Sequence, residues 1–146
     1  MITRMCAQPT RKGKATKIIL DSNALFVPLQ FKIDIFEELK NLLKTNLEYI
    51  LLSPVKKELQ ELAEKGQPQI RKNATYALEL ARKCKLVKVN EAYESLAPDD
   101  VILRTAREWN CPVFTNDRQL RKKLRDINVP VIYVRQKSRL EIDGRV

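Results

Sequence analysis

A short apolar run that stops at an aspartate constrains the fold of this chain more than any other feature. Ile18, Ile19 and Leu20 follow Lys17 and lead directly into Asp21. Three consecutive branched apolar residues predict a strand that is buried on both faces, as in a parallel sheet. An aspartate at the carboxyl end of such a strand lies at the edge where open α/β sheets bind their ligands. The stretch therefore predicts an α/β fold with a carboxylate at its ligand-binding edge.

Strands and helices alternate along the rest of the chain. Apolar runs predict four further strands, at residues 48–52, 86–89, 112–115 and 130–134. Helical spacing and helix-start signals predict helices at residues 34–44, from 54 onward, at 70–84, at 98–109 and from 117 onward. Residues 24–31 contain Pro28 and are expected to be a connection. This alternation predicts a three-layer α/β/α domain with a central parallel sheet of about five strands.

The chain of 146 residues is most simply one domain. We expect the domain to span residues 17–134, between a basic N-terminal arm at 1–16 and a polar C-terminal tail at 135–146. The arm carries Arg4, Arg11, Lys12 and Lys14 and no acidic residue. Two interpretations of it stay open, an untidy terminus and an arm that lies on a phosphate backbone.

Composition excludes several classes of catalytic site. Histidine is absent, which rules out a Ser-His-Asp or Cys-His site and a histidine-ligated zinc. Any catalysis must therefore use carboxylates, lysine, hydroxyl groups or a bound metal. The net charge of +10 favours a polyanionic partner, with RNA or DNA ahead of an acidic membrane surface.

The compartment is predicted from what the sequence lacks. No apolar run approaches the length of a membrane span or resembles a signal peptide, so we expect a cytoplasmic protein with no membrane partner. Cys6, Cys84 and Cys111 are odd in number and far apart, which predicts reduced cysteines rather than disulfides or a zinc site.

Four acidic residues are predicted to converge at the carboxyl edge of the sheet. Asp21 and Asp117 follow strands, Asp100 opens a helix at the same edge, and Glu58 borders the buried face of another helix. Singly, each acid has a structural explanation, such as a favourable charge in a first helical turn. Together they would repel one another and hold protons at neutral pH. A divalent cation relieves that repulsion, and all-oxygen ligation favours Mg²⁺ or Mn²⁺ over zinc.

Four segments in this order resemble the motifs of the PIN-domain nucleases. They are Asp21-Ser22-Asn23, Ser53-Pro54-Val55-Lys56-Lys57-Glu58-Leu59, Asp100-Val101-Ile102-Leu103 and Thr115-Asn116-Asp117-Arg118-Gln119-Leu120. The last segment is the most specific, and the resemblance covers roughly residues 17–134. Asp99 could act in place of Asp100 or beside it. Residues 28–36, 98–100 and 131–144 are most similar to the archaeal and eukaryotic PIN nucleases of the small-subunit processome.

The resemblance implies a metal-dependent endoribonuclease, a hydrolase that cleaves phosphodiester bonds in single-stranded or loop RNA. Asp21, Glu58, Asp100 and Asp117 would hold one or two Mg²⁺ or Mn²⁺ ions, which activate water and stabilise developing charge. The residues that position these acids or the substrate would be Ser22, Asn23, Thr115 and Asn116. The contacts to the RNA backbone would come from Arg118, Arg121, Lys122 and Lys123. A solvated helix face also explains most of these four cations. Pre-ribosomal RNA is the implied substrate, with pre-ribosomal proteins or a second copy of the chain as further partners.

Single residues exclude two other functions of α/β proteins. A haloacid-type phosphatase requires a second Asp where Asn23 stands, and a dinucleotide-binding fold requires glycines that this chain lacks. Two alternatives remain open. One is a toxin ribonuclease of the VapC type, with the same chemistry on transfer or messenger RNA and a protein inhibitor. The other is a non-catalytic RNA-binding scaffold on a degenerate PIN fold.

Overall fold

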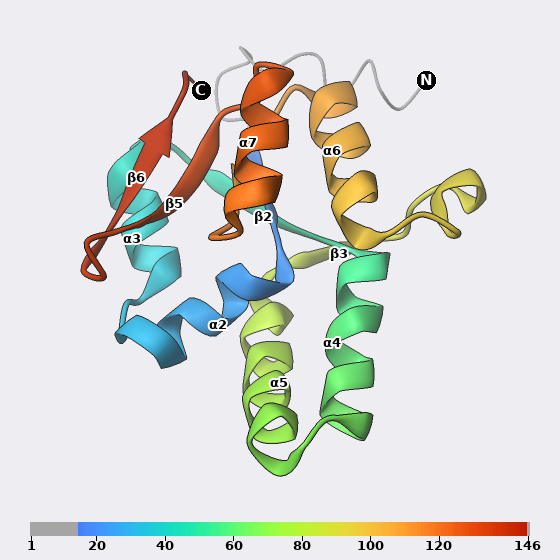
Figure 1. Cartoon of the computed structure of the whole chain (residues 1–146). Coiled ribbons are helices and arrows are strands. Elements are labelled where there is room, and N and C mark those ends of the chain that lie inside the picture. The colour runs from blue at the N-terminus through green and yellow to red at the C-terminus, as the bar shows by residue number, and fades with distance from the viewer. Residues whose placement is uncertain (1–14, 146) are drawn as a thin grey trace.

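A six-stranded sheet with helices on both faces organises the chain in the computed structural model, which describes residues 15–145 (Figure 1). The strands are β1 (Thr16–Leu20), β2 (Leu47–Leu52), β3 (Lys85–Val87), β4 (Val113–Phe114), β5 (Val131–Arg135) and β6 (Arg139–Asp143). The helices are α2 (Ser22–Phe31), α3 (Ile35–Leu43), α4 (Ser53–Lys65), α5 (Pro68–Leu80), α6 (Pro98–Trp109) and α7 (Arg118–Asp126), with short 3₁₀ turns η1 (Ala81–Lys83) and η2 (Glu91–Tyr93). The predicted α/β fold is confirmed. Most of the predicted basic arm lies outside the described residues.

The strand order places β1 at the centre of the parallel part of the sheet. The order is β3-β2-β1-β4-β5-β6, and all neighbours are parallel except β5 and β6. The direction of winding reverses between β1 and β4, which is the switch point where open α/β sheets bind ligands. Leu20 pairs with Phe114 in the register of these two strands. The next residues, Asp21 and Thr115, therefore leave the sheet side by side.

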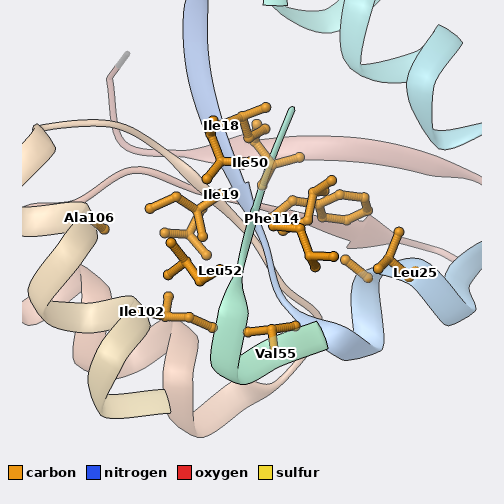
Figure 2. Close-up of a cluster of buried hydrophobic side chains, with 14 of the residues drawn as sticks. Ile18, Ile19, Leu25, Ile50, Leu52, Val55, Ile102, Ala106 and Phe114 are labelled. Carbon is orange, nitrogen blue, oxygen red and sulfur yellow. The ribbon is translucent and has the colours of Figure 1, made fainter. Parts of the chain in front are cut away.

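The core explains why β1 is central. Ile18, Ile19 and Leu20 are fully buried, as a strand covered on both faces requires. In Figure 2, Ile102 and Ala106 of α6 lie on one side of the strands and Leu25 of α2 on the other. Figure 1 shows α6 and α7 extending toward one end of the molecule, whereas α4 and α5 form a hairpin toward the other. The four helices that begin after β1, β2, the η2 segment and β4 thus surround the switch point.

Residues 24–31, expected to be a connection, are instead helical. Helix α2 begins directly after Asp21 and contains Pro28 in its interior. Proline removes one backbone donor and disfavours a helix interior. Here the burial of Ala24, Leu25 and Val27 outweighs that cost. The consequence for the site is that Asp21 is both the residue after β1 and the N-cap of a helix.

The polar tail predicted at residues 135–146 is wrong as a description of this segment, because it contains β6. The strand pairs antiparallel with β5 along its whole length and buries Leu140. Polar and apolar residues alternate in Arg139–Asp143, which is the period of a half-buried strand. Gln136 and Lys137 adopt left-handed backbone conformations in the connecting turn, without the glycine or asparagine that usually indicates a hairpin.

Several boundaries differ from the sequence prediction by a few residues. The third strand is Lys85–Val87, and the helix expected at 70–84 is α5 followed by η1. Ser53, expected as an N-cap, is the first residue of α4, and its hydroxyl accepts a hydrogen bond from the Val89 N–H at 3.1 Å. Within residues 15–145, none of the helices combines the length and apolar character that crossing a bilayer requires.

Candidate active site

Asp21 is a buried carboxylate held by two hydrogen bonds. Its side-chain Oδ1 accepts from the Ser22 N–H at 2.7 Å and its Oδ2 accepts from the Thr115 hydroxyl at 2.8 Å. Only 3% of the residue is exposed. Burial raises the pKa of Asp21 from 3.8 to about 6, the two hydrogen bonds oppose the rise, and the charges of Asp99 and Glu58 add to it. The protein therefore holds a carboxylate in an environment that disfavours its charge.

Thr115, Asn23 and Asn116 connect the ends of β1, β4 and β5. The Thr115 hydroxyl donates to Asp21 and also accepts from the Asp117 N–H at 3.1 Å. Asn23 Oδ1 accepts from the Asn116 N–H at 2.9 Å, and Asn116 Oδ1 accepts from the Val134 N–H at 2.9 Å. These bonds fix the direction in which the chain leaves each strand. Asn116 thus links the segment after β1 to β5.

Asp117 begins α7 as its N-cap. Its Oδ1 accepts from the backbone N–H groups of Gln119 at 2.9 Å and Leu120 at 3.3 Å. One carboxylate oxygen of Asp117 thus caps the helix. The same cap fixes the position of the carboxyl group at the carboxyl end of β4, next to Thr115.

Asp99 interacts electrostatically with each of the other three acids. Its charge raises the pKa of Asp21 and of Glu58, both of which are raised first by burial. The pKa of Asp99 is itself raised by burial, then by the charge of Asp117 and, to a smaller extent, by the charge of the adjacent Asp100. The Ser22 side chain lowers the pKa of Glu58, against the larger effect of burial. Asp21, Glu58, Asp99 and Asp117 therefore form one interacting group, named here the acidic cluster.

Asp100, the predicted third ligand, lies on another face of α6. It is exposed and lines a surface pocket between α6 and α7 with Arg104, Arg107 and Lys123. Helical spacing explains the difference, because Asp99 is three and seven residues before the buried Ile102 and Ala106. That spacing was available in the sequence and would have favoured Asp99. The roles of all these acids as metal ligands stay predictions.

The donor set fits a hard divalent cation. In the described part of the chain, no three Asp, Glu or Cys side chains lie close enough together to hold a metal by themselves. The acidic cluster nevertheless supplies only carboxylate oxygens, and mutual repulsion disfavours its ionised form. Mg²⁺ usually retains several waters and binds through one or two carboxylates, so an open group of acids suits it.

The four cations predicted to contact RNA lie on α7 but differ in their surroundings. Arg118 and Lys122 are exposed. Arg121 forms an ion pair with Asp143 at 3.6 Å and lies over the Tyr133 ring, with 3.6 Å between its Cζ atom and the ring centroid. Lys123 lowers the pKa of Asp99, against the larger effect of burial. A positively charged helix thus begins at the acidic cluster, while contact with RNA stays a prediction.

The pKa of Asp21 predicts how the stability of the metal-free protein depends on pH. The folded state holds the proton of Asp21 up to about pH 6, whereas the unfolded chain loses it near pH 3.8. Stability therefore falls as pH rises through this window, by about 3 kcal/mol from this group. We expect urea unfolding in chelator to give equal stabilities for wild type and Asp21→Asn at pH 3.5. At pH 7 the variant should be more stable, and equal stabilities there would contradict the prediction.

Comparison with known proteins identifies the family. The family model described as a PIN-like domain matches residues 18–137, so the chain belongs to this family of nucleases. Ribonuclease VapC4 of Methanocaldococcus jannaschii is 38% identical over 135 residues, which cover 89% of this chain and 98% of that protein. Ribonuclease VapC9 of Archaeoglobus fulgidus is 23% identical over 139 residues, which cover 95% of this chain and 98% of that protein.

Solved structures agree with this family and fold. The PIN domain endonuclease Utp24 superposes with a TM-score of 0.73 at 26% identity, covering 89% of this chain and 92% of that one. A VapBC2 complex from Rickettsia felis bound to a promoter DNA fragment gives a TM-score of 0.60 at 16% identity, covering 82% of this chain and all of that one, and shows the fold alone. The predicted resemblance to PIN-domain nucleases is confirmed.

Proposed function

We propose that this chain is a Mg²⁺- or Mn²⁺-dependent endoribonuclease. The observation that carries the proposal is Asp21, a buried carboxylate at the switch point whose pKa is raised to about 6 by burial and by neighbouring acids. Burying a carboxylate without a positive partner is costly, so its retention among other acids supports a cation-binding role. The net charge of +10 around such a site supports a polyanionic substrate.

The acidic cluster would hold one or two cations. Asp99 takes the position that the sequence predicted for Asp100, because Asp99 interacts with Asp21, Glu58 and Asp117. Bound there, the cation would activate water and stabilise charge on the phosphodiester. Thr115 orients Asp21 through its hydroxyl donor and Asp117 through its acceptor. Ser22 favours the charged form of Glu58, and the Asn23 side chain holds Asn116 by accepting a hydrogen bond from its N–H.

Two RNA targets are supported by different observations. The similarity of residues 28–36, 98–100 and 131–144 to small-subunit processome nucleases supports pre-ribosomal RNA, with pre-ribosomal proteins as partners in the cytoplasm. The likeness to the PIN domain endonuclease Utp24 supports endonuclease action on either target. The 38% identity to Ribonuclease VapC4 favours the second candidate, a toxin ribonuclease whose partner is an inhibitory protein. We propose pre-ribosomal RNA as the target, and the experiment below distinguishes it from the target of a toxin ribonuclease.

A substrate comparison tests the proposal. Wild type is incubated with Mn²⁺ or Mg²⁺ and equal amounts of a small-subunit pre-ribosomal RNA fragment, transfer RNA and messenger RNA. Cleavage of the pre-ribosomal fragment at a defined site, lost in chelator, is expected. Preferred cleavage of transfer or messenger RNA would replace the first target by the second. Binding of RNA without cleavage of any substrate would instead favour a non-catalytic scaffold.

A further inference from the structure

A positively charged pocket lies beside the acidic cluster, at the carboxyl ends of β4 and β5. It is an open depression of about 400 Å³ lined by residues of α7, by the last residues of β5 and the turn that follows, and by Asn116. Three arginines, Arg118, Arg121 and Arg135, line it together with Tyr133. Among residues 15–145, no carboxylate belongs to its lining. The acidic cluster and this arginine pocket thus carry opposite charge at adjacent positions.

Asn116 separates the two sites and belongs to both. It precedes Asp117 directly, and its backbone N–H donates to Asn23 beside Asp21. Its side-chain Oδ1 accepts from the Val134 N–H, and Val134 is itself part of the pocket lining. The relative position of the pocket and the acids is therefore fixed by hydrogen bonds rather than by a flexible loop.

Two of the three guanidinium groups form ion pairs with acids that lie outside the pocket. Arg121 lies on the Tyr133 ring at 3.6 Å and pairs with Asp143, while Arg135 pairs with Glu141 at 3.0 Å. Both acids lie on β6 and neither lines the pocket. Arg118, the residue after Asp117, has no ion-pair partner within the described part of the chain. The pocket therefore contains two pre-oriented cations and one whose charge is not neutralised.

We propose that the arginine pocket binds the phosphate group of a nucleotide that flanks the cleaved linkage in single-stranded RNA. This inference rests on the proposed ribonuclease function and extends it to a specific subsite. Guanidinium groups bind phosphate through paired hydrogen bonds, and planar arginine and tyrosine side chains also stack with unpaired bases. A cation held by the acidic cluster would supply positive charge at the scissile phosphate, whereas a neighbouring phosphate would depend on cationic side chains of the protein. The pocket beside Asn116 supplies that charge directly next to the acids.

Binding is tested without cleavage in an Asp21→Asn background. Fluorescence anisotropy with a labelled single-stranded RNA of about 12 nucleotides compares Arg118→Ala with Arg107→Ala. Arg107 is an exposed arginine in the last turn of α6, at the other end of that helix from Asp99. We expect Arg118→Ala to weaken binding about tenfold and to reduce the salt slope by about 0.7, as the loss of one phosphate contact predicts. Arg107→Ala should bind as the parent does. Equal loss in both variants, or no loss in Arg118→Ala, would overturn the proposal.

A double-mutant cycle assigns the contact to one phosphate. Neutral methylphosphonate linkages are placed one at a time along the same RNA. At one linkage, the substitution and Arg118→Ala should be non-additive, because each removes the same contact. Additive effects at every linkage would contradict a phosphate subsite. Both measurements use a cleavage-inactive protein and report binding alone. If wild type fails to cleave RNA, the proposed function is refuted, but the binding data still decide whether the pocket binds a phosphate.

Discussion

Replacing Asp21 by asparagine is expected to reduce RNA cleavage by more than about a hundredfold while making the metal-free protein more stable at pH 7. Loss of a carboxylate that binds the cation should exceed the roughly 10–100-fold cost of removing a group that only orients a ligand. The gain in stability, about 1–3 kcal/mol, follows from removing a buried charge whose pKa is raised to about 6. Single-turnover cleavage and urea unfolding measure the two effects.

Asp34→Asn is the matched control for this substitution. Asp34 is also the N-cap of a helix and accepts a hydrogen bond from the Glu37 N–H, but it is exposed. Asparagine caps helices as well as aspartate does, so this variant should keep the cleavage rate and the stability of wild type. A cleavage rate near wild type in Asp21→Asn, or an unfolded Asp21→Asn, would contradict the role assigned to this residue.

Mn²⁺ is expected to raise the melting temperature of wild type by about 5–10 °C at a concentration of about 100 times its Kd. A ligand that binds only the folded state contributes about 2.7 kcal/mol at that concentration, and each kcal/mol shifts Tm by about 2–4 °C for a chain near this size. Differential scanning fluorimetry at pH 7 measures the shift. Repulsion among the raised-pKa acids is relieved at the same time, which adds to the effect.

The response to Mn²⁺ should depend on the acidic cluster alone. Asp21→Asn should lose most of the shift, whereas Asp34→Asn should retain it. A wild-type Tm that does not change between zero and millimolar Mn²⁺ would mean that the acids do not share a cation. An equal shift in Asp21→Asn would mean that the ion binds elsewhere, for example among the other exposed carboxylates.

The centre of the fold could be predicted because local sequence determines it. Ile18–Leu20 are apolar on both faces, and a parallel sheet buries both faces of its strands. The alternation of strands and helices then determines which chain ends meet, so the order of the elements alone places Asp21 and Asp117 at one edge. Helix α2 could not be predicted, because Pro28 disfavours a helix locally. The helix is stabilised by the burial of Leu25 and Val27 in the tertiary structure.

The prediction and the structure differ in which aspartate at the start of α6 interacts with the other acids: the predicted residue is Asp100, and the structure favours Asp99. Two adjacent aspartates satisfy the same motif, and only the direction of the apolar stripe distinguishes them. Ile102 and Ala106 are buried, and Asp99, on the same face of the helix, is half-buried and raises the pKa of Asp21, whereas Asp100 is exposed. The arginine pocket could not be predicted at all, because it combines α7 with a hairpin whose turn carries no glycine or asparagine signal.

The affinity of single variants for Mn²⁺ is the most direct test of the metal site proposed at the acidic cluster. Titration calorimetry compares wild type with Glu58→Gln, Asp99→Asn, Asp117→Asn and Asp100→Asn. We expect the first three substitutions to weaken Mn²⁺ binding at least about tenfold, as loss of a coordinating or orienting carboxylate predicts. Asp100→Asn should bind Mn²⁺ nearly as wild type does, since Asp100 is exposed and lines a different pocket, between α6 and α7. Wild-type affinity in Asp99→Asn together with a loss in Asp100→Asn would contradict the assignment.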